Sequence, residues 1–495
     1  MLEEILEKYF GYRSFKKGQK ETIASILAGK HTLAMLPTGT GKSLCYQLPG
    51  YLFDGAVIIV SPLLSLMQDQ VEQMMKFKEK RVIALNSFLT GTERRMALKE
   101  LENYKFIFIS PEMLQTEPVL KKLKMLSISL FVVDEAHCIS QWGYDFRPDY
   151  LKLGEIRRQL GSPLTLALTA TATKEVREDI LRSLQLHDAA KIESTVDRPT
   201  IAFSIVQTSD YLEKQMHTLE YAQNLEKPGI IYFSSKKIAD QMAQFLRENG
   251  LGRVMAYHGG LDQEQRTLIQ QQFIHHQLDI ICATSAFGMG INKENVRFVI
   301  HFHMPLQIES YLQEIGRAGR DGLPSIAILL YSPGDEQLPI QLVESELPAN
   351  WQIDWVFRYI KEQRPDNLSF MQKELLEMGG FSETQLRLME EFLNGVPFPL
   401  SNLEEIQRRM EQYVERRLSI KKTNIANVKK WVEAKRCRRE MILDYFNETV
   451  GTKVANCCDH CGIDLEMYEA KPLKPAKDEP VSWKNYLRKI LVNES

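Results

Sequence analysis

The sequence lacks any apolar run long enough to cross a membrane. A spanning helix needs about 18 or more consecutive apolar residues, and the longest candidate, residues 55–67, is interrupted by Ser61 and Pro62. The N-terminal segment, MLEEILEKYF, carries three Glu and lacks the basic start of a signal peptide. These absences predict a cytoplasmic protein with no membrane partner.

The chain also has little net charge and few residues that break regular structure. Its 62 Lys and Arg oppose 64 Asp and Glu, a formal net charge of -2. The total charge therefore does not indicate a nucleic-acid partner, which would need a local basic face. With 27 Gly and 20 Pro among 495 residues, collagen-like and long low-complexity segments are excluded. At roughly 150 residues per domain, the length suggests about three domains.

Cysteine is scarce and unevenly distributed. The chain has seven Cys, an odd number that argues against a secreted disulfide framework. Four of them lie between Cys437 and Cys461, and the Cys458-x-x-Cys461 spacing lets two thiolates share one tetrahedral metal. We therefore predict a zinc site formed by Cys437, Cys457, Cys458 and Cys461. His460 is the substitute ligand if Cys457 cannot reach, and buried free thiols are the alternative.

Short apolar runs alternate with helix-like segments over the first 335 residues. The runs are continuous, which is typical of parallel strands covered by helices on both faces. This pattern predicts two consecutive α/β domains, residues 1–200 and 201–340, with a boundary near Val196–Phe203, where Asp197-Arg198-Pro199-Thr200 breaks the pattern. The predicted strands are His31–Leu36, Ala56–Val60, Lys105–Ile109, Leu130–Val133, Leu164–Leu168, Gly229–Phe233, Gly252–Ala256, Asp279–Ala283, Arg297–Phe302 and Ser325–Leu330.

The strand signal stops after about residue 340, and residues 341–465 are predicted to form a helical, zinc-binding region. Within it, residues 431–446 have the spacing of one helix that carries Cys437. Residues 401–440 hold 12 Lys and Arg against 6 Asp and Glu, a local excess that we expect to face DNA phosphates.

Two further segments have local signals. Residues 372–392 predict a helix, a Gly-Gly turn and a second helix with Ser382 as its cap. This pair is either a DNA-binding helix-turn-helix or an ordinary αα-hairpin, and the hairpin is the commoner of the two motifs. Residues 466–495 are rich in charge and proline, which predicts a disordered tail.

A glycine-rich segment follows the first predicted strand. In Leu36-Pro-Thr-Gly-Thr-Gly-Lys-Ser43 the glycines let backbone N–H groups cradle phosphates at the start of a helix. Lys42 would reach the β- and γ-phosphates, and the Ser43 hydroxyl would hold Mg²⁺. The general pattern begins with Gly where Leu36 stands, and the alternative is an ordinary turn with an exposed Lys. The expected nucleotide-binding residues are Thr38, Gly39, Thr40, Gly41, Lys42 and Ser43.

Two carboxylates follow another apolar run. Asp134 is predicted to bind Mg²⁺ through water, and Glu135 to orient or deprotonate an attacking water. Alone they would indicate a solvated loop, but together with Lys42 they predict nucleotide hydrolysis. Arg317 and Arg320, three residues apart, can supply positive charge to the γ-phosphate, with a surface basic pair as the alternative.

In this order, these motifs resemble the superfamily-2 helicases and, within them, the RecQ family of DNA helicases. The resemblance covers residues 5–335 and resumes at the cysteine cluster. The segments that carry it are Tyr9–Gln19, Ser61–Gln70, the DEAH box Asp134–His137, the aromatic-rich Cys138–Tyr150, Ala167–Thr173, Ala283–Lys293 and Gln313–Arg320.

The resemblance implies two tandem RecA-like P-loop domains followed by a helical zinc-binding domain, with ATP, Mg²⁺ and Zn²⁺ as cofactors. It implies ATP-driven unwinding of duplex DNA with 3′–5′ polarity, in DNA repair, recombination and replication restart. It further implies single-stranded and 3′-tailed or forked DNA as substrates, single-stranded-DNA-binding protein and other repair factors as partners, and a location at the bacterial nucleoid.

The resemblance also assigns individual residues. Gln19 would read adenine, and Arg317 and Arg320 would reach the nucleotide from the second domain. For Trp142 and Phe146, core packing is the alternative to base stacking. The residues expected to bind DNA are Ser61, Ser110, Trp142, Phe146, Arg147, His258 and Thr284.

Two departures from the family pattern point to a short form similar to the RecS type. About 100 residues separate Arg320 from Cys437, and no room remains after Cys461 for winged-helix and HRDC domains. One alternative function is an RNA helicase or a translocase that does not unwind DNA, against which the aromatic-rich segment argues. Another is a zinc-stabilised DNA-binding scaffold with an inactive motor, against which the intact Lys42 and Asp134 argue.

Overall fold

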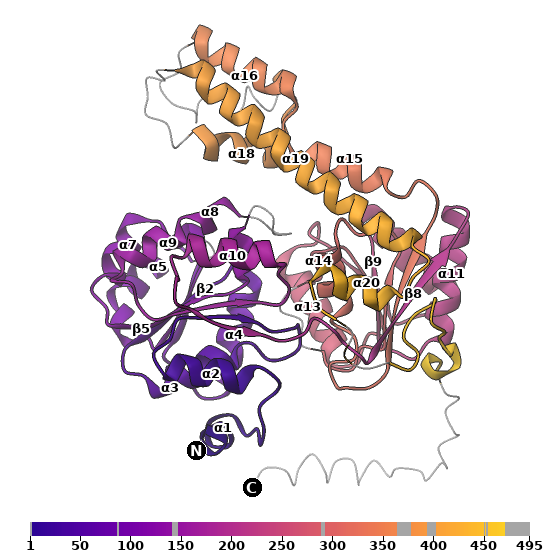
Figure 1. Ribbon diagram of the computed structural model, residues 1–495, viewed down its shortest axis with the longest axis horizontal. Coiled ribbons are helices and arrows are strands. Elements are labelled where there is room, and N and C mark those ends of the chain that lie inside the picture. The colour runs from indigo at the N-terminus through magenta and orange to yellow at the C-terminus, as the bar shows by residue number, and fades with distance from the viewer. Residues whose placement is uncertain are drawn as a thin grey trace.

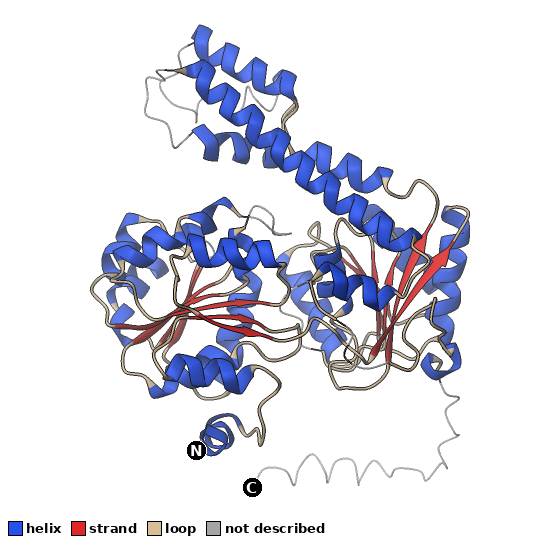
Figure 2. Cartoon of the chain, in the orientation of Figure 1, coloured by secondary structure: helices blue, strands red, loops and turns tan. Residues whose placement is uncertain are grey.

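The computed structural model describes residues 2–86, 89–140, 147–288, 293–363, 378–393, 402–449, 451 and 454–470. Two parallel sheets lie side by side, each covered by helices, and a helical region extends from the second (Figures 1 and 2). The ten predicted strands are all present, within one to two residues of the predicted limits. Two α/β domains of parallel sheet followed by a helical region confirm the predicted fold class.

The first sheet has seven parallel strands in the order β3-β4-β2-β5-β6-β1-β7. Alternate residues of a strand enter different cores: Leu130 and Val132 face α2, α3 and α4, whereas Phe131 and Val133 face α7, α9 and α10. The strands are β1 (Thr32–Met35), β2 (Ala56–Val60), β3 (Val82–Leu85), β4 (Phe106–Ile109), β5 (Ile128–Val133), β6 (Thr165–Thr169) and β7 (Ala190–Glu193). The helices are α1 (Leu2–Phe10), α2 (Gln19–Leu27), α3 (Leu44–Leu52), α4 (Leu64–Lys76), α5 (Gly91–Lys99), α6 (Pro111–Leu114), α7 (Glu117–Leu123), α8 (Pro148–Leu151), α9 (Leu153–Gln159) and α10 (Lys174–Ser183).

The second sheet has six parallel strands in the order β10-β11-β9-β12-β13-β8. Its strands are β8 (Ile201–Gln207), β9 (Gly229–Tyr232), β10 (Val254–Tyr257), β11 (Ile280–Ala283), β12 (Phe298–His301) and β13 (Ser325–Tyr331). Its helices are α11 (Tyr211–Asn224), α12 (Lys236–Glu248), α13 (Gln263–Ile274) and α14 (Ile308–Ile315). In both sheets the carboxyl ends of the strands carry the loops with polar motifs, as parallel α/β folds require.

The remaining helices form an arm and a base (Figure 1). The arm consists of α16 (Asn350–Gln363), α18 (Glu383–Leu393) and the first half of α19 (Leu403–Glu433), whose buried side chains include Phe357, Met389 and Met410. The base consists of α15 (Gln337–Glu346), the second half of α19 and α20 (Arg438–Tyr445), and it packs against the second sheet. The 31-residue α19 therefore connects a separate helical core to the second domain.

The prediction of one continuous helix over residues 431–446 was wrong. Helix α19 ends at Glu433 and α20 begins at Arg438, with Cys437 in an extended conformation between them (φ -54°, ψ 123°). The Arg438 guanidinium donates hydrogen bonds to the carbonyls of Trp431 (2.8 Å) and Ala434 (2.8 Å). These bonds satisfy carbonyls that a continuing helix would otherwise have paired, so the chain turns and the Cys437 thiol is redirected.

The basic stretch at residues 401–440 does not present its charge excess freely. Six of its twelve cations pair with carboxylates that lie outside the stretch. The pairs are Lys421–Glu346, Lys422–Glu344 (2.6 Å), Lys429–Glu336 (2.5 Å), Arg436–Asp444 (3.2 Å), Arg438–Asp459 (2.9 Å) and Arg439–Asp197. The expectation that the stretch as a whole faces DNA is corrected accordingly, because carboxylates outside the stretch neutralise six of its twelve cations.

Two smaller predictions meet the structure in part. The Ser382 hydroxyl accepts the backbone N–H of Gln385 at 3.3 Å, which confirms the cap of α18, while residues 372–377 of the predicted helix pair lie outside the described residues. In the predicted disordered tail, residues 466–470 are ordered: Tyr468 is buried in the second core, and the Ala470 N–H donates to the carbonyl of Asn224 at 2.8 Å. None of the described helices is both long and apolar enough to span a membrane.

Candidate nucleotide cleft and metal centre

The glycine-rich loop between β1 and α3 is held from the N-terminal segment. The Gln19 side-chain amide donates to the carbonyls of Thr40 (2.6 Å) and Gly41 (3.0 Å), and the Lys16 ammonium donates to the carbonyl of Gly39 (2.9 Å). Gly39 has a φ of 83°, and a Cβ there would lie 2.8 Å from Cγ of Arg320. The close approach of the second domain therefore requires glycine at this position.

A cavity of about 400 Å³ lies between the two domains at this loop. The first domain lines it with the whole loop from Thr38 to Ser43 and with Asp134 and Glu135, and the second domain lines it with Gln313, Arg317 and Arg320. Phe10, Tyr12 and Gln19 line another part. All the residues expected to act on the nucleotide thus surround one cavity, whose volume suits a nucleoside triphosphate.

The carboxylates at the end of β5 meet the lysine of the glycine-rich loop. The Lys42 ammonium lies 3.2 Å from Oε1 of Glu135, whose backbone has the left-handed φ of 46°. Burial and the neighbouring Glu135 raise the pKa of Asp134 to about 6, against the opposing effect of Lys42. A bound divalent cation would relieve this buried negative charge, and Asp134 and Ser43 both line the cavity where Mg²⁺ with ATP would lie. The residues therefore fit ATP with Mg²⁺.

Polar side chains of the second domain line the same cavity at the place where an anion would bind. Among the described residues, Nε of Arg317 and Nε2 of Gln313 are buried without a hydrogen-bond partner. Burial, together with Arg317 and Arg198, lowers the pKa of Arg320 to about 9. Buried polar groups and crowded cations of this kind are costly unless a ligand satisfies them, and a triphosphate would do so.

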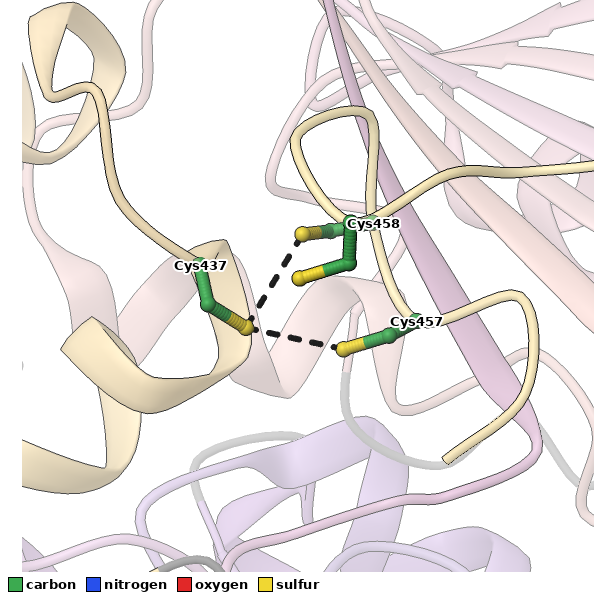
Figure 3. Close-up of side chains that lie close together, drawn as sticks. Cys437, Cys457 and Cys458 are labelled. Carbon is green, nitrogen blue, oxygen red and sulfur yellow. Dashed lines mark hydrogen bonds between the residues drawn. The ribbon is translucent and has the colours of Figure 1, made fainter. Parts of the chain in front are cut away.

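The four cysteines converge on one point. Their sulfur atoms all lie within 4.8 Å of one another. The Cys437 sulfur is 3.6 Å from that of Cys457 and 3.9 Å from that of Cys458, and the three thiols point toward one another (Figure 3). Four sulfurs at about 2.3 Å from a zinc ion would stand roughly 3.8 Å apart, so the spacing fits tetrahedral Zn²⁺ and not a disulfide. The group includes Cys457, so His460 is not needed as its substitute.

The surroundings of the thiols also suit a metal. Burial opposes ionisation of Cys458, but backbone N–H groups of Arg438, Cys461 and His460 outweigh it and lower the pKa of this thiol. A thiolate is the form that binds zinc. The loop is fixed to the second sheet, because the Phe203 N–H donates to the carbonyl of Cys457 (3.2 Å) and the Asp459 N–H to that of Phe203 (2.9 Å).

The residues expected to bind DNA differ in exposure. Trp142 and Phe146 lie outside the described residues. Ser61 is 1% exposed, Ser110 caps α6 through Met113, and both ring nitrogens of His258 have partners, Asp240 (3.0 Å) and the Gly260 N–H (3.2 Å). Thr284 is half-buried after β11, and Arg147 donates to the carbonyl of Pro62 at 2.7 Å. Contact of these residues with DNA stays a prediction.

Sequence reasoning missed Lys16, Arg198 and Arg439. Arg198 was noted only as part of a break in the strand pattern, yet its guanidinium reaches the glycine-rich loop and the loop of Arg317. Arg439 was counted in the basic stretch, yet it is 1% exposed. No local signal marks these roles, since the partners of Arg198 are 160 and 118 residues away in sequence.

Comparison with known families identifies three parts of the chain. Residues 16–179 match the DEAD/DEAH box helicase model, residues 210–322 the helicase conserved C-terminal domain, and residues 401–463 the RecQ zinc-binding domain. The chain is 46% identical over 492 residues to the probable ATP-dependent DNA helicase RecS of Bacillus subtilis, covering 99% of this chain and 97% of that protein.

The chain belongs to the RecQ family of DNA helicases. It is also 35% identical to the ATP-dependent DNA helicase RecQ of Haemophilus influenzae, over 93% of this chain and 63% of that one. It covers about half (52%) of the RecQ of Pasteurella multocida, at 43% identity. RecQ-family membership and the four clustered thiols together support Zn²⁺ at the cysteine centre.

Solved structures show the same fold at low identity. The Mycobacterium smegmatis helicase Lhr bound to single-stranded DNA and AMP-PNP aligns with a TM-score of 0.56 and 21% identity, over 69% of this chain and 49% of that one. Saccharomyces cerevisiae Dbp5 bound to RNA and ADP BeF3 aligns with a TM-score of 0.54 and 20% identity, over 68% and 90%. These RecA-like pairs support the fold of this RecQ-family chain.

Proposed function

We propose that this RecQ-family chain is an ATP-dependent DNA helicase that moves 3′ to 5′ along one strand and thereby unwinds duplex DNA. The carrying observation is the interdomain cavity, where Lys42, Asp134 and Glu135 of one domain face Arg317 and Arg320 of the other. Such a cavity couples hydrolysis to domain movement, because the stabilising charge for the γ-phosphate comes from the far side. The family relationship to RecS and RecQ supports DNA as the polymer.

Each residue has a proposed role in hydrolysis. Lys42 binds the β- and γ-phosphates, Ser43 and Asp134 hold Mg²⁺, and Glu135 orients the attacking water. Arg317 and Arg320 stabilise charge on the transferred phosphoryl group. Gln19 and the neighbouring Tyr12 receive the adenine side of the nucleotide, which the cavity lining supports.

The test of substrate and polarity is an unwinding assay on three labelled duplexes: 3′-tailed, 5′-tailed and forked. We expect ATP-dependent unwinding of the 3′-tailed and forked duplexes and none of the 5′-tailed duplex. ATP hydrolysis measured with single-stranded DNA and with RNA of the same length decides between a DNA and an RNA motor. Stimulation by RNA alone, or unwinding of only the 5′-tailed duplex, would contradict the proposal.

We also propose the cellular setting that this activity fits. A motor for 3′-tailed and forked DNA suits repair, recombination and replication restart, at the nucleoid in the cytoplasm. Single-stranded-DNA-binding protein and other repair factors are its expected partners, because they meet the strands it exposes. Pull-down with a tagged chain after DNA damage, with nuclease treatment as the control for DNA bridging, tests these partners.

A further inference from the structure

The connector between the two sheets is held on both sides. Residues 194–200 join β7 to β8. On the side of the zinc-binding region, the Glu448 carboxylate accepts the Thr195 hydroxyl and the Val196 N–H (3.1 Å). On the side of the nucleotide cleft, Arg198 points into the space where the two domains meet. The connector therefore touches both proposed functional centres.

Arg198 joins the two loops that form the cleft. One guanidinium nitrogen, Nη1, donates to the carbonyls of Thr38 (3.1 Å) and Gly316 (3.2 Å), and the other, Nη2, to those of Ala318 (3.0 Å) and Gly319 (2.9 Å). Thr38 belongs to the glycine-rich loop, and residues 316–319 carry Arg317 and precede Arg320. Because the guanidinium is planar and its donors form a rigid fork, these four bonds fix how the loops stand relative to each other.

Glycine at the same junction shows how closely the loops meet. A Cβ on Gly316 would lie 2.2 Å from the Thr38 hydroxyl oxygen. Since the two loops are already in contact, a small displacement of Arg198 moves Arg317 and Arg320 relative to Lys42. Arg198 itself does not line the nucleotide cavity, so an effect of Arg198 on hydrolysis would act through the loops that it joins.

Arg439 holds the connector residue beside Arg198. Its guanidinium forms an ion pair with Asp197 and donates to the carbonyls of Arg198 (3.2 Å) and Ile201 (2.6 Å). It also lies over the Phe203 ring, 4.9 Å from its centroid. A buried cation with this many partners leaves the connector little freedom.

Three consecutive residues link this contact to the metal centre. Cys437 is one of the four clustered thiols, Arg438 binds the end of α19 and Asp459, and Arg439 binds the connector. The backbone of the Cys457–Asp459 loop pairs in turn with Phe203 of β8. The zinc-binding region and the connector are thus fixed to each other by a continuous set of contacts.

We infer that Arg198 is a positioning residue for ATP hydrolysis and that Arg439, held at the metal centre, keeps Arg198 in place. This inference rests on the proposed ATPase function of the cleft. It gives the zinc-binding region a role in the chemistry of the motor, which the region performs through the connector and without contact with the nucleotide.

The first test is Arg198→Lys, which keeps the charge but cannot bridge four carbonyls. We expect kcat for ATP to fall about 10- to 100-fold, because misplacement by about 1 Å can cost up to about 10²-fold. KM for ATP should change less than about threefold, since the loop contacts to the phosphates remain. Affinity for single-stranded DNA and the melting temperature should stay near those of wild type. The matched control is Arg158→Ala, which removes an exposed ion pair with Glu155 within α9 of the same domain, and should leave kcat unchanged.

The second test is Arg439→Lys, with zinc content measured alongside. All four thiols remain, so about one zinc per chain is expected, while kcat should fall about 3- to 10-fold as the connector loosens. The control is Arg436→Ala, which removes an exposed pair with Asp444. If Arg439→Lys does not yield folded protein, Asp197→Asn breaks the same ion pair and should lower kcat in the same way.

The outcomes separate the inference from the function beneath it. A wild-type kcat in Arg198→Lys would overturn the inference and leave the proposed ATPase function standing. The same holds for a wild-type kcat in Arg439→Lys or, if that variant does not fold with zinc bound, in Asp197→Asn. A loss of kcat matched by an equal loss in melting temperature and DNA affinity overturns it as well, because general destabilisation would then be the cause. Absence of hydrolysis in the wild-type chain overturns the proposed function and the inference together.

Discussion

At the scale of the residue, the position of Lys42 in the interdomain cavity suits the binding of a phosphate. Among the described residues, its ion-pair partner is the Glu135 carboxylate at 3.2 Å. The same carboxylate would have to be free of Lys42 in order to orient the attacking water. A γ-phosphate entering the cavity would take over Lys42 and release Glu135. The ion pair therefore keeps the Lys42 and Glu135 side chains at the proposed phosphate site.

Lys42→Ala should abolish hydrolysis, because the phosphates lose the cation of the glycine-rich loop. A loss of at least about 10²-fold in kcat is the scale expected when a preorganised charge is removed. Binding of labelled single-stranded DNA should persist, since Lys42 is not among the residues that we expect to contact DNA. Lys20→Ala, which breaks an exposed pair with Glu3, is the control. Near-normal hydrolysis by Lys42→Ala would refute the proposed nucleotide site.

A second residue gives a pH-dependent prediction outside the catalytic set. Burial raises the pKa of Glu309 on α14, against the opposing hydrogen bond from the Tyr445 hydroxyl (2.8 Å). The buried Oε2 of Glu309 has no hydrogen-bond partner within the part of the chain that the structure describes. A carboxyl whose folded-state pKa lies above its unfolded value costs stability as pH rises through that window, and the full cost is present at higher pH.

Glu309→Gln should therefore melt at a higher temperature than wild type at pH 8, because a neutral amide keeps the acceptor for Tyr445 without the buried charge. The difference should shrink as pH falls below the ordinary pKa of Glu, where the carboxyl is protonated in both the folded and the unfolded state. Thermal unfolding of both chains across this pH range is the measurement. A destabilised variant at pH 8 would show that the charge has a favourable partner.

At the scale of the element, α19 shows how tertiary pairing changes the meaning of a charge pattern. Lys421, Lys422 and Lys429 lie on the part of α19 beside α15 and pair with its Glu344 and Glu346 and with Glu336 just before it. Ion pairs between solvent-exposed side chains of this kind contribute little to stability. They hold the second half of α19 against α15 within the base, and they neutralise the charge that these lysines would otherwise present to DNA.

Lys421→Ala together with Lys422→Ala should leave the salt dependence of DNA binding unchanged. Each ammonium that binds a phosphate of single-stranded DNA adds about 0.7 to the slope of log K against log [salt], so two contacts would lower the slope by about 1.4 in the double variant. Titration of labelled single-stranded DNA at several salt concentrations measures this. A reduced slope would show that these two lysines do contact DNA phosphates.

The elements also show which parts of the fold the sequence could predict. Strands buried on both faces, such as β2 and β5, have continuous apolar runs and were predicted. Strands β3 and β7 are the two edge strands of the first sheet, β7 alternates in burial, and β8 begins inside the predicted boundary at residues 196–203, so none of these three was found. The ligands of the cleft follow from local motifs, but the break before Cys437 and the bonds of Arg198 depend on partners far away in sequence, and no local pattern encodes them.

At the scale of the whole molecule, the cysteine centre lies where three parts meet. Its loop pairs with β8, its first ligand lies between α19 and α20, and the residue after Arg438 holds the connector between the sheets. The described part of this loop after Asn447 is short and largely polar, so metal binding supplies stability that it cannot obtain from a core of its own. Loss of the metal should therefore affect the connector as well as the loop.

Cys458→Ala tests this dependence across the molecule. The variant should lose its zinc, whereas wild type holds about one per chain by elemental analysis. Its loop should then separate from Phe203, the connector should become accessible to protease, and unwinding and basal ATP hydrolysis should both fall. Cys282→Ala removes a buried cysteine from β11, away from the centre, and should lower the melting temperature while keeping the zinc and the protection of the connector.

Full zinc content in Cys458→Ala would show that this thiol is not a ligand. A zinc-free variant with wild-type hydrolysis would show that the metal centre and the cleft work independently.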